Sequence, residues 1–151
     1  MDDGAPIPAV SVTTPDGQTI QLTDLPLPAV VYFYPKDDTS GCTREAQDFS
    51  ALAEDFAAAG ASVMGISKDS PAAHTKFIAK HGLIVTLGSD EDGSVCEAFG
   101  VWGEKKLYGK TYMGIERATF LFGADGALVR AWRKVKVPGH AAAVLEAVRA
   151  L

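Results

Sequence analysis

The chain has 151 residues, of which 47% are hydrophobic and 22% are charged, and its formal net charge at pH 7 is −5. This length and composition predict a single globular domain over residues 1–151. The negative charge argues against nucleic acid or an anionic membrane surface as a partner. No apolar run approaches the length of a membrane span, and the N-terminus has no basic segment followed by an apolar one. We therefore expect a protein that is neither membrane-bound nor secreted.

The cysteine content indicates the redox compartment. Cys42 and Cys96 are the only two cysteines, they are far apart, and they form no Cys-x-x-Cys pair. This usage differs from the disulfide framework of secreted proteins and predicts a reducing cytoplasm. The three histidines (His74, His81, His140) are scattered and add no spacing typical of metal ligands. We expect no metal site.

Local signals predict the first elements of the chain. Residues 10–12 and 19–22 alternate apolar with polar side chains around Pro15-Asp16-Gly17, which indicates a β-hairpin. The continuous apolar run at 29–34 is typical of a central strand that is buried on both faces. After a polar turn, the apolar residues of 41–60 follow a helical spacing that ends at a glycine.

The remainder of the chain alternates between apolar runs and amphipathic segments, with glycine or proline at the boundaries. In chain order we predict a strand at 61–67, a helix at 71–82, a strand at 83–87, a short helix at 95–100, a long loop at 101–114, strands at 117–122 and 127–132, and a helix at 138–151. This order predicts an α/β, thioredoxin-like fold. Its mixed central sheet would carry helices on both faces and an N-terminal β-hairpin. Long loops inside compact domains tend to be functional.

Cys42 lies at the predicted start of the helix that follows the central strand. The free N–H groups of a helix start favour a negative charge on sulfur and so lower the pKa of a thiol. Ser40 and Gly41 beside it are small, and Thr39 or Ser40 can cap the helix. Open α/β sheets place their sites at such strand ends. Cys96 has apolar neighbours instead, which predicts a buried structural cysteine.

The pattern Pro35-x-x-x-Thr39-x-x-Cys42 resembles the active-site pattern of the peroxiredoxins. Longer segments resemble the bacterioferritin-comigratory (PrxQ) branch of that family, and together they cover nearly the whole chain. These segments are Tyr32–Thr39, Gly41–Ala46, Ser89–Gly93, Val95–Lys105 and Gly109–Arg117.

The resemblance implies a thiol peroxidase. The thiolate of Cys42 would attack a hydroperoxide and become a sulfenic acid, while water or an alcohol leaves. Thr39, the backbone N–H groups at the cysteine and Arg117 would stabilise the charge on the leaving oxygen. Without the resemblance, Arg117 would be interpreted as a solvated charge at a strand end. No metal, haem or flavin cofactor is implied, because sulfur carries the redox chemistry. The residues expected to shape the pocket are Pro35, Tyr34 and Gly41.

The thiol that would resolve the sulfenic acid is missing from its usual positions. Members of this branch carry a second cysteine five residues after the first or in the next helix, where this chain has Gln47 and Ile78. Ser40 also replaces a common proline. The chain could be a one-cysteine enzyme reduced by thioredoxin or a small thiol, Cys96 could resolve after local unfolding or from a second subunit, or resolution could be inefficient. We favour the first, because a disulfide needs Cα atoms within about 7 Å and nothing in the sequence brings Cys96 near Cys42. The resemblance also implies a monomer.

Two other functions are compatible with a lone reactive cysteine. A cysteine hydrolase would need His74, His81 or His140 as its base, but none has a local signature, and we expect His74 and His140 at exposed helix starts. A thioredoxin-fold binding or chaperone-like module would contain a non-catalytic cysteine. That alternative predicts that Cys42→Ser leaves function intact.

Overall fold

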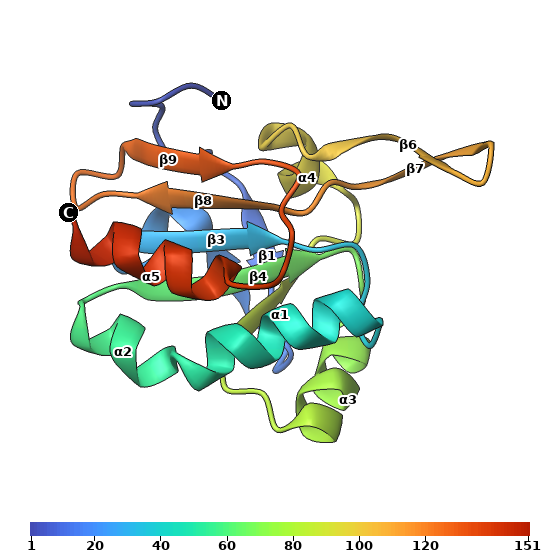
Figure 1. The fold of residues 1–151 in the computed structure, drawn as a ribbon, viewed down its shortest axis with the longest axis horizontal. Helices are drawn as coiled ribbons and strands as arrows, with labels where there is room; N and C mark the ends of the chain where they lie inside the picture. The colour runs from blue at the N-terminus through green and yellow to red at the C-terminus, as the bar shows by residue number, and fades with distance from the viewer.

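A computed structural model describes residues 1–151. Seven strands form the central sheet: β1 (Ser11–Thr13), β2 (Thr19–Gln21), β3 (Ala29–Phe33), β4 (Ser62–Ser67), β5 (Thr86–Ser89), β8 (Ala118–Phe122) and β9 (Leu128–Trp132). Their order in the sheet is β2-β1-β5-β4-β3-β8-β9 (Figure 1). Strands β3, β4 and β5 are parallel, whereas β1, β2, β8 and β9 are antiparallel to their neighbours. The predicted mixed sheet with an N-terminal hairpin is confirmed.

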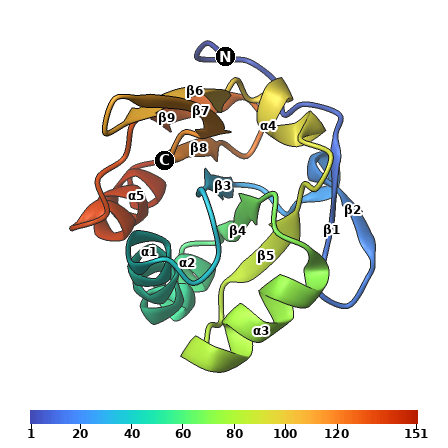
Figure 2. The same ribbon diagram turned by 90° about the vertical axis from the view of Figure 1, so that its right-hand side faces the viewer.

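Helices cover both faces of this sheet. They are α1 (Ser40–Ala51), α2 (Ala53–Ala58), α3 (Pro71–His81), α4 (Ser94–Ala98) and α5 (His140–Arg149), with a 3-10 turn η1 (Leu22–Asp24) after β2. Figure 2 shows α1, α2 and α5 on one side of the sheet and the short α4 on the other. The helix predicted at 41–60 is interrupted at Leu52, where φ −99° and ψ 8° depart from helical values. None of the helices is long and apolar enough to cross a membrane.

Strand β3 separates two hydrophobic cores. All five of its residues are buried, as the continuous apolar run predicted. Tyr32 belongs to the core on the α1 side, which also contains Cys42. Phe33 belongs to the core on the α4 side, which contains Cys96. Since successive side chains of a strand point to opposite faces, the sheet lies between the two cysteines.

Local capping fixes the ends of α3 as the sequence predicted. The side chain of Ser70 accepts a hydrogen bond from the backbone N–H of Ala73, and Pro71 takes the first helical position. Gly82 ends the helix with a φ of 60°, a left-handed conformation that glycine adopts at little cost. Helix α1 begins differently. Its N-cap is Thr39, but the hydroxyl of Thr39 makes no capping hydrogen bond.

The prediction of a long loop at residues 101–114 is wrong. This segment forms most of an antiparallel hairpin of β6 (Trp102–Leu107) and β7 (Lys110–Ile115), which projects from the body of the molecule as an arm (Figure 1). Gly103 pairs with Gly114 across the two strands, so glycines that looked like loop punctuation lie inside the ladder. Most side chains of the arm are exposed, and the alternation that normally identifies a half-buried strand is therefore missing.

Candidate active site

Arg117 joins Cys42 to a buried glutamate. Its Nη2 donates to the Sγ of Cys42 at 3.4 Å, and its Nη1 donates to Oε1 of Glu45 at 2.7 Å. Cys42 is the third residue of α1, and Arg117 immediately precedes β8. Because the last residue of β3, Phe33, pairs with Ala118, the start of β8 lies where the chain leaves β3 toward α1. This register brings together two residues that are 75 positions apart in sequence.

The contact lies at the edge of the α1-side core and is shielded from solvent. Cys42 and the side chain of Glu45 are each 1% exposed, and the side chain of Arg117 is 17% exposed. Burial raises the pKa of Glu45 to about 7, although Arg117 acts in the opposite direction, and Oε2 of Glu45 has no partner. Burial disfavours the charge of Arg117, but Glu45 and Cys42 outweigh it and raise the pKa of Arg117 above its ordinary value. A fixed cation therefore lies beside the sulfur.

Glu45 was not predicted as a site residue. A signal existed in the sequence, because Glu45 lies three residues after Cys42 and so on the same face of α1. A single acidic residue at such a spacing is common on solvated helix faces, so the burial of Glu45 becomes visible only in the tertiary structure.

Gly41 makes room for the guanidinium. A Cβ atom placed at Gly41 would lie 3.2 Å from Nη2 of Arg117, closer than an ordinary van der Waals contact. The first N–H groups of a helix have no partner within the helix and carry partial positive charge. Cys42 thus belongs to the first turn of α1, and its sulfur contacts the cation of Arg117.

The other predicted residues border this contact. The hydroxyl of Thr39 is exposed and donates to the carbonyl of Lys36 at 2.9 Å, which closes the turn before α1. Pro35 lines a pocket beneath the β6–β7 arm. Tyr34 is buried, and its hydroxyl donates to Oδ1 of Asp37 at 2.6 Å. Burial, reinforced by neighbouring Tyr32 and Asp37, raises the pKa of Tyr34 far above its ordinary value. Tyr34 is therefore uncharged, and its side chain supports the loop through Asp37.

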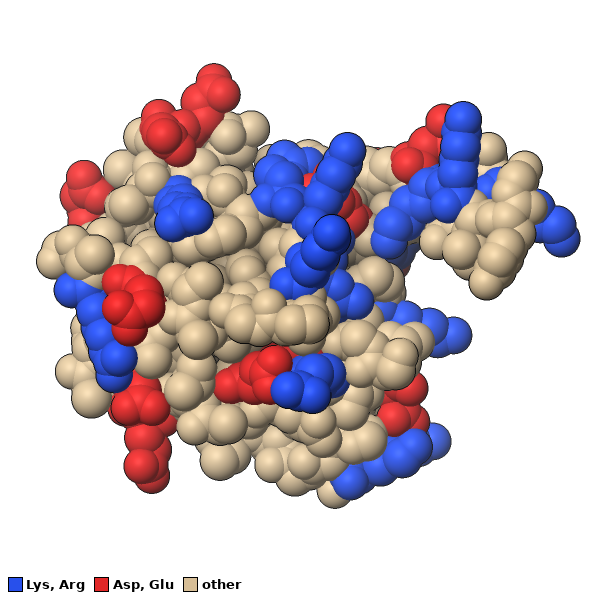
Figure 3. Space-filling view, viewed as in Figure 1, with Lys and Arg blue, Asp and Glu red and all other residues tan.

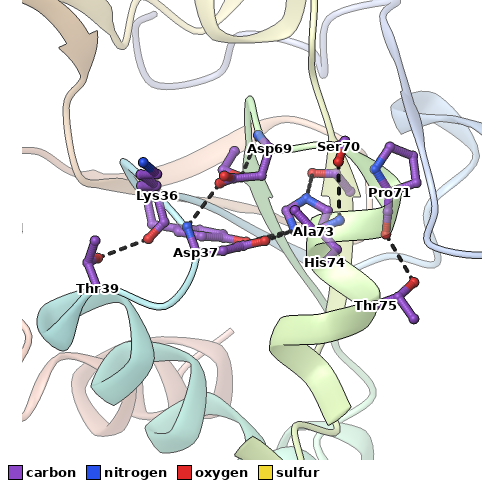
Figure 4. Close-up of polar contacts among 12 residues, drawn as sticks. Lys36, Asp37, Thr39, Asp69, Ser70, Pro71, Ala73, His74 and Thr75 are labelled. Carbon is purple, nitrogen blue, oxygen red and sulfur yellow. Dashed lines mark hydrogen bonds and ion pairs between the residues drawn. The ribbon is translucent and has the colours of Figure 1, made fainter. Parts of the chain in front are cut away.

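A buried polar network fixes the loop between β3 and α1 (Figure 4). Nδ1 of His74, on α3, lies 2.6 Å from Oδ2 of Asp37, and its Nε2 lies 3.2 Å from the carbonyl oxygen of Gly88. The backbone N–H of Asp37 donates to Asp69 at 2.9 Å. Both ring nitrogens of His74 thus have oxygen partners, one of which is the carboxylate of Asp37.

The expectation that His74 and His140 lie at exposed helix starts is wrong. His74 is 0% exposed and His140 is 7% exposed. Buried polar groups are stable when they are hydrogen-bonded, and His140 meets this condition through Thr119 at 2.7 Å. His81 contacts Asp38 at 2.8 Å. No hydrogen bond of these histidines goes to Cys42, so the site lacks the base of a cysteine hydrolase.

Cys96 is buried, as its apolar neighbours predicted. It is fully buried in α4. The backbone N–H groups of Val95 and Cys96 donate to the carboxylate of Asp90 at 3.1 and 2.8 Å. Burial, with Asp90, raises the pKa of Cys96 well above its ordinary value, so this sulfur stays a thiol. Both cysteines are free.

Comparison with known proteins agrees with this fold. The model of the AhpC/TSA family matches residues 4–131, and the chain belongs to this family. It is 54% identical over 121 residues to peroxiredoxin Bcp of Xanthomonas campestris, an alignment that covers 80% of this chain and 76% of the relative. It is 45% identical over 150 residues to peroxiredoxin Bcp of Bacillus subtilis, which covers 99% of this chain and 96% of that one.

Solved structures give the same result. The bacterioferritin comigratory protein of Xanthomonas campestris, in structures that concern its alkyl peroxide reduction activity, has a TM-score of 0.90 and 45% identity, covering 99% of this chain and 98% of its own. BcpB of Mycobacterium tuberculosis has a TM-score of 0.87 and 32% identity, covering 100% and 98%. Within its family the chain is therefore a peroxiredoxin of the Bcp branch, as its motifs indicated. It belongs to an enzyme class, the thiol peroxidases.

Proposed function

We propose that Cys42 is the peroxidatic cysteine of a peroxidase that reduces hydrogen peroxide and organic hydroperoxides. The observation that carries this assignment is the 3.4 Å contact from Arg117 to the sulfur. Thr39 and Arg117 are its proposed catalytic partners, and Pro35, Tyr34 and Gly41 shape the pocket. The alkyl peroxide reduction activity studied in the Xanthomonas campestris relative supports the choice of substrate.

The proposed oxidation is a two-electron displacement on oxygen. An electron pair of the Cys42 thiolate forms the S–O bond, and the O–O bond breaks. The leaving oxygen takes the bonding pair, accepts a proton and departs as water or an alcohol. Donors that are already in place stabilise the developing charge without reorganising. Arg117 and the N–H groups at the start of α1 supply such donors, and Thr39 lies in the turn beside them.

For the reductive half of the cycle we propose a one-cysteine mechanism. Gln47 is exposed on α1, Ile78 lies on α3, and Cys96 belongs to the core on the other side of the sheet. An external thiol would attack the sulfenic sulfur, forming a mixed disulfide and releasing water. A second thiol would then displace Cys42 as its thiol and leave as the disulfide of the reductant. Thioredoxin or a small thiol can supply these two electrons.

Peroxide consumption tests the assignment directly. Wild type, Cys42→Ser and Cys96→Ser are compared with dithiothreitol or thioredoxin as reductant, and Cys96→Ser serves as the matched buried-cysteine control. We expect Cys42→Ser to lose turnover while it keeps its circular dichroism spectrum, and Cys96→Ser to retain turnover. Activity that survives in Cys42→Ser would overturn the assignment. It would favour the non-enzymatic alternative of a thioredoxin-fold binding or chaperone-like module.

Intact mass tests the one-cysteine mechanism. After one equivalent of hydrogen peroxide, we expect a protein that has gained one oxygen atom on Cys42. A full yield of protein that has instead lost two hydrogen atoms, with a peptide linking Cys42 to Cys96, would contradict it.

We also infer that residues 1–151 act as one thioredoxin-like domain, because a single sheet carries both cores. The proposal places the protein in the reducing cytoplasm, where two free cysteines persist. We propose that the protein is a monomer and uses no metal or organic cofactor, as the family resemblance implies. Sedimentation equilibrium would test the oligomeric state.

A further inference from the structure

A pocket of about 360 Å³ lies between the loop after β3 and the base of the β6–β7 arm. Its walls combine cations with apolar rings, and no carboxylate lines it. Figure 3 shows Lys and Arg side chains along the arm at the right of the molecule and a notch in the outline beneath it. The cations are Lys36, Lys68 and Lys105, and the other lining residues include Pro35, Trp102 and Ile115.

The pocket adjoins the Cys42 site. Pro35 opens the turn that leads to Cys42, and Ile115, at the other wall, lies two residues before Arg117. Nζ of Lys105 donates to the carbonyl oxygen of Ile115 at 2.7 Å, which holds the ammonium group at this wall. Burial and Arg117 lower the pKa of Lys105, whereas Cys42 acts in the opposite direction, so Lys105 lies within electrostatic reach of both site residues.

The lysines give the pocket a charge opposite to that of the whole chain. The chain carries a formal net charge of −5, yet three lysines converge here. Nζ of Lys68 lies 4.2 Å from the ring centroid of Trp102, a cation–π contact that restricts its position. Lysines next to apolar side chains can bind a ligand that has a carboxylate at one end and an apolar part beside it.

We propose that this pocket binds the carboxylate of a small thiol and so selects anionic low-molecular-weight thiols as reductants of oxidised Cys42. The inference rests on the proposed one-cysteine peroxidase. Since Cys42 is 1% exposed, a thiol on a rigid protein surface cannot reach the sulfur unless the start of α1 opens. A small thiol needs a smaller opening than a protein does, and its carboxylate would be held by Lys36 and Lys68.

The covalent steps balance with the small thiol as the only reductant. The thiolate of the bound molecule forms an S–S bond with the sulfur of Cys42, and the S–O bond breaks as hydroxide leaves and becomes water. A second molecule attacks the sulfur of the first. Cys42 is released as thiolate, and the two small thiols leave as their disulfide.

The experiment measures the two half-reactions separately by rapid mixing. Cys42 is first oxidised with hydrogen peroxide. It is then reduced with 3-mercaptopropionate, 2-mercaptoethanol or cysteamine, which are anionic, neutral and cationic, and rates are compared at equal thiolate concentration. We expect the anionic thiol to react about tenfold faster than the neutral one at low salt, and this preference to shrink as salt screens the lysines. Equal rates for the anionic and neutral thiols would overturn the proposal.

Matched variants locate the effect. Lys36→Gln with Lys68→Gln should slow reduction by 3-mercaptopropionate about tenfold and leave the rate with 2-mercaptoethanol unchanged. Lys76→Gln with Lys136→Gln removes the same charge from exposed positions outside the pocket and should change neither rate. An equal loss in both double variants would refute a specific site.

Two other results would show where the reasoning fails. In the first, the lysines of the pocket bind the carboxylate of a substrate instead of that of a reductant. If the Lys36 and Lys68 substitutions slow oxidation by a carboxylated hydroperoxide and leave reduction unchanged, the pocket serves the substrate and the reductant proposal is wrong. If hydrogen peroxide fails to oxidise Cys42 in the wild type, the proposed peroxidase function fails instead.

Discussion

The buried pair of Asp37 and His74 allows a sharp test of what holds the active-site loop in place. The side chain of His74 is 0% exposed and that of Asp37 is 6% exposed, and they meet at 2.6 Å. His74→Leu keeps an apolar side chain of moderate size but leaves the carboxylate of Asp37 buried, with only the hydroxyl of Tyr34 bound to it. Leaving a buried carboxylate without its partner costs about 3–5 kcal/mol. We expect a loss of unfolding free energy in this range.

Urea denaturation followed by tryptophan fluorescence at pH 7 measures this loss. A domain of this size loses roughly 2–4 °C of melting temperature per kcal/mol, so the midpoint should also fall by about 10 °C. Thr75→Ala is the control on the same helix, because the hydroxyl of Thr75 bonds only to the carbonyl of Pro71 at an exposed position. It should change stability by less than about 0.5 kcal/mol.

The double variant decides whether the charge is responsible. Asp37→Asn with His74→Leu removes the carboxylate together with its partner, so it should recover a large part of the stability that His74→Leu alone loses. Since Asp37 lies two residues before Thr39, we expect His74→Leu to slow oxidation of the cysteine by peroxide more than its alkylation by iodoacetamide, which does not use Thr39. A loss below about 1 kcal/mol in the single variant, or strictly additive effects in the double one, would refute the reasoning.

Three other predictions follow from close contacts and burial. Gly41→Ala should push Arg117 away and slow peroxide oxidation about tenfold, about 1.4 kcal/mol of barrier, without lowering the melting temperature, because its Cβ would lie 3.2 Å from Nη2. Gly65→Ala should destabilise the fold by roughly 1–3 kcal/mol in urea titration, because its Cβ would clash with the ring of Tyr32. Burial lowers the pKa of His140 to about 4. Between about pH 6.5 and pH 4 the unfolded chain therefore binds a proton that the folded chain does not, and the unfolding free energy should fall as the pH is lowered through this range. The fall should be smaller in His140→Gln.

Short-range chemistry in the sequence determined much of the fold and the identity of the reactive thiol. The apolar run of β3, the cap and proline at Ser70-Pro71, and the glycine that ends α3 each act within a few residues. Their outcome can be predicted from neighbours alone. The pattern from Pro35 to Cys42 is equally local, and its family resemblance indicated the chemistry before any distance was known.

Only the tertiary structure decided what surrounds the thiol. Strand register brought Arg117 to Cys42, and burial made Glu45 and His74 parts of the site rather than solvated charges. The sheet placed Cys96 in a different core. Pairing across the sheet and the removal of water depend on residues many positions apart, and no window of sequence contains both partners of such a contact. The hairpin of β6 and β7 was missed for the same reason. Its strands are defined by pairing with each other, and its exposed sequence with several glycines does not reveal this pairing.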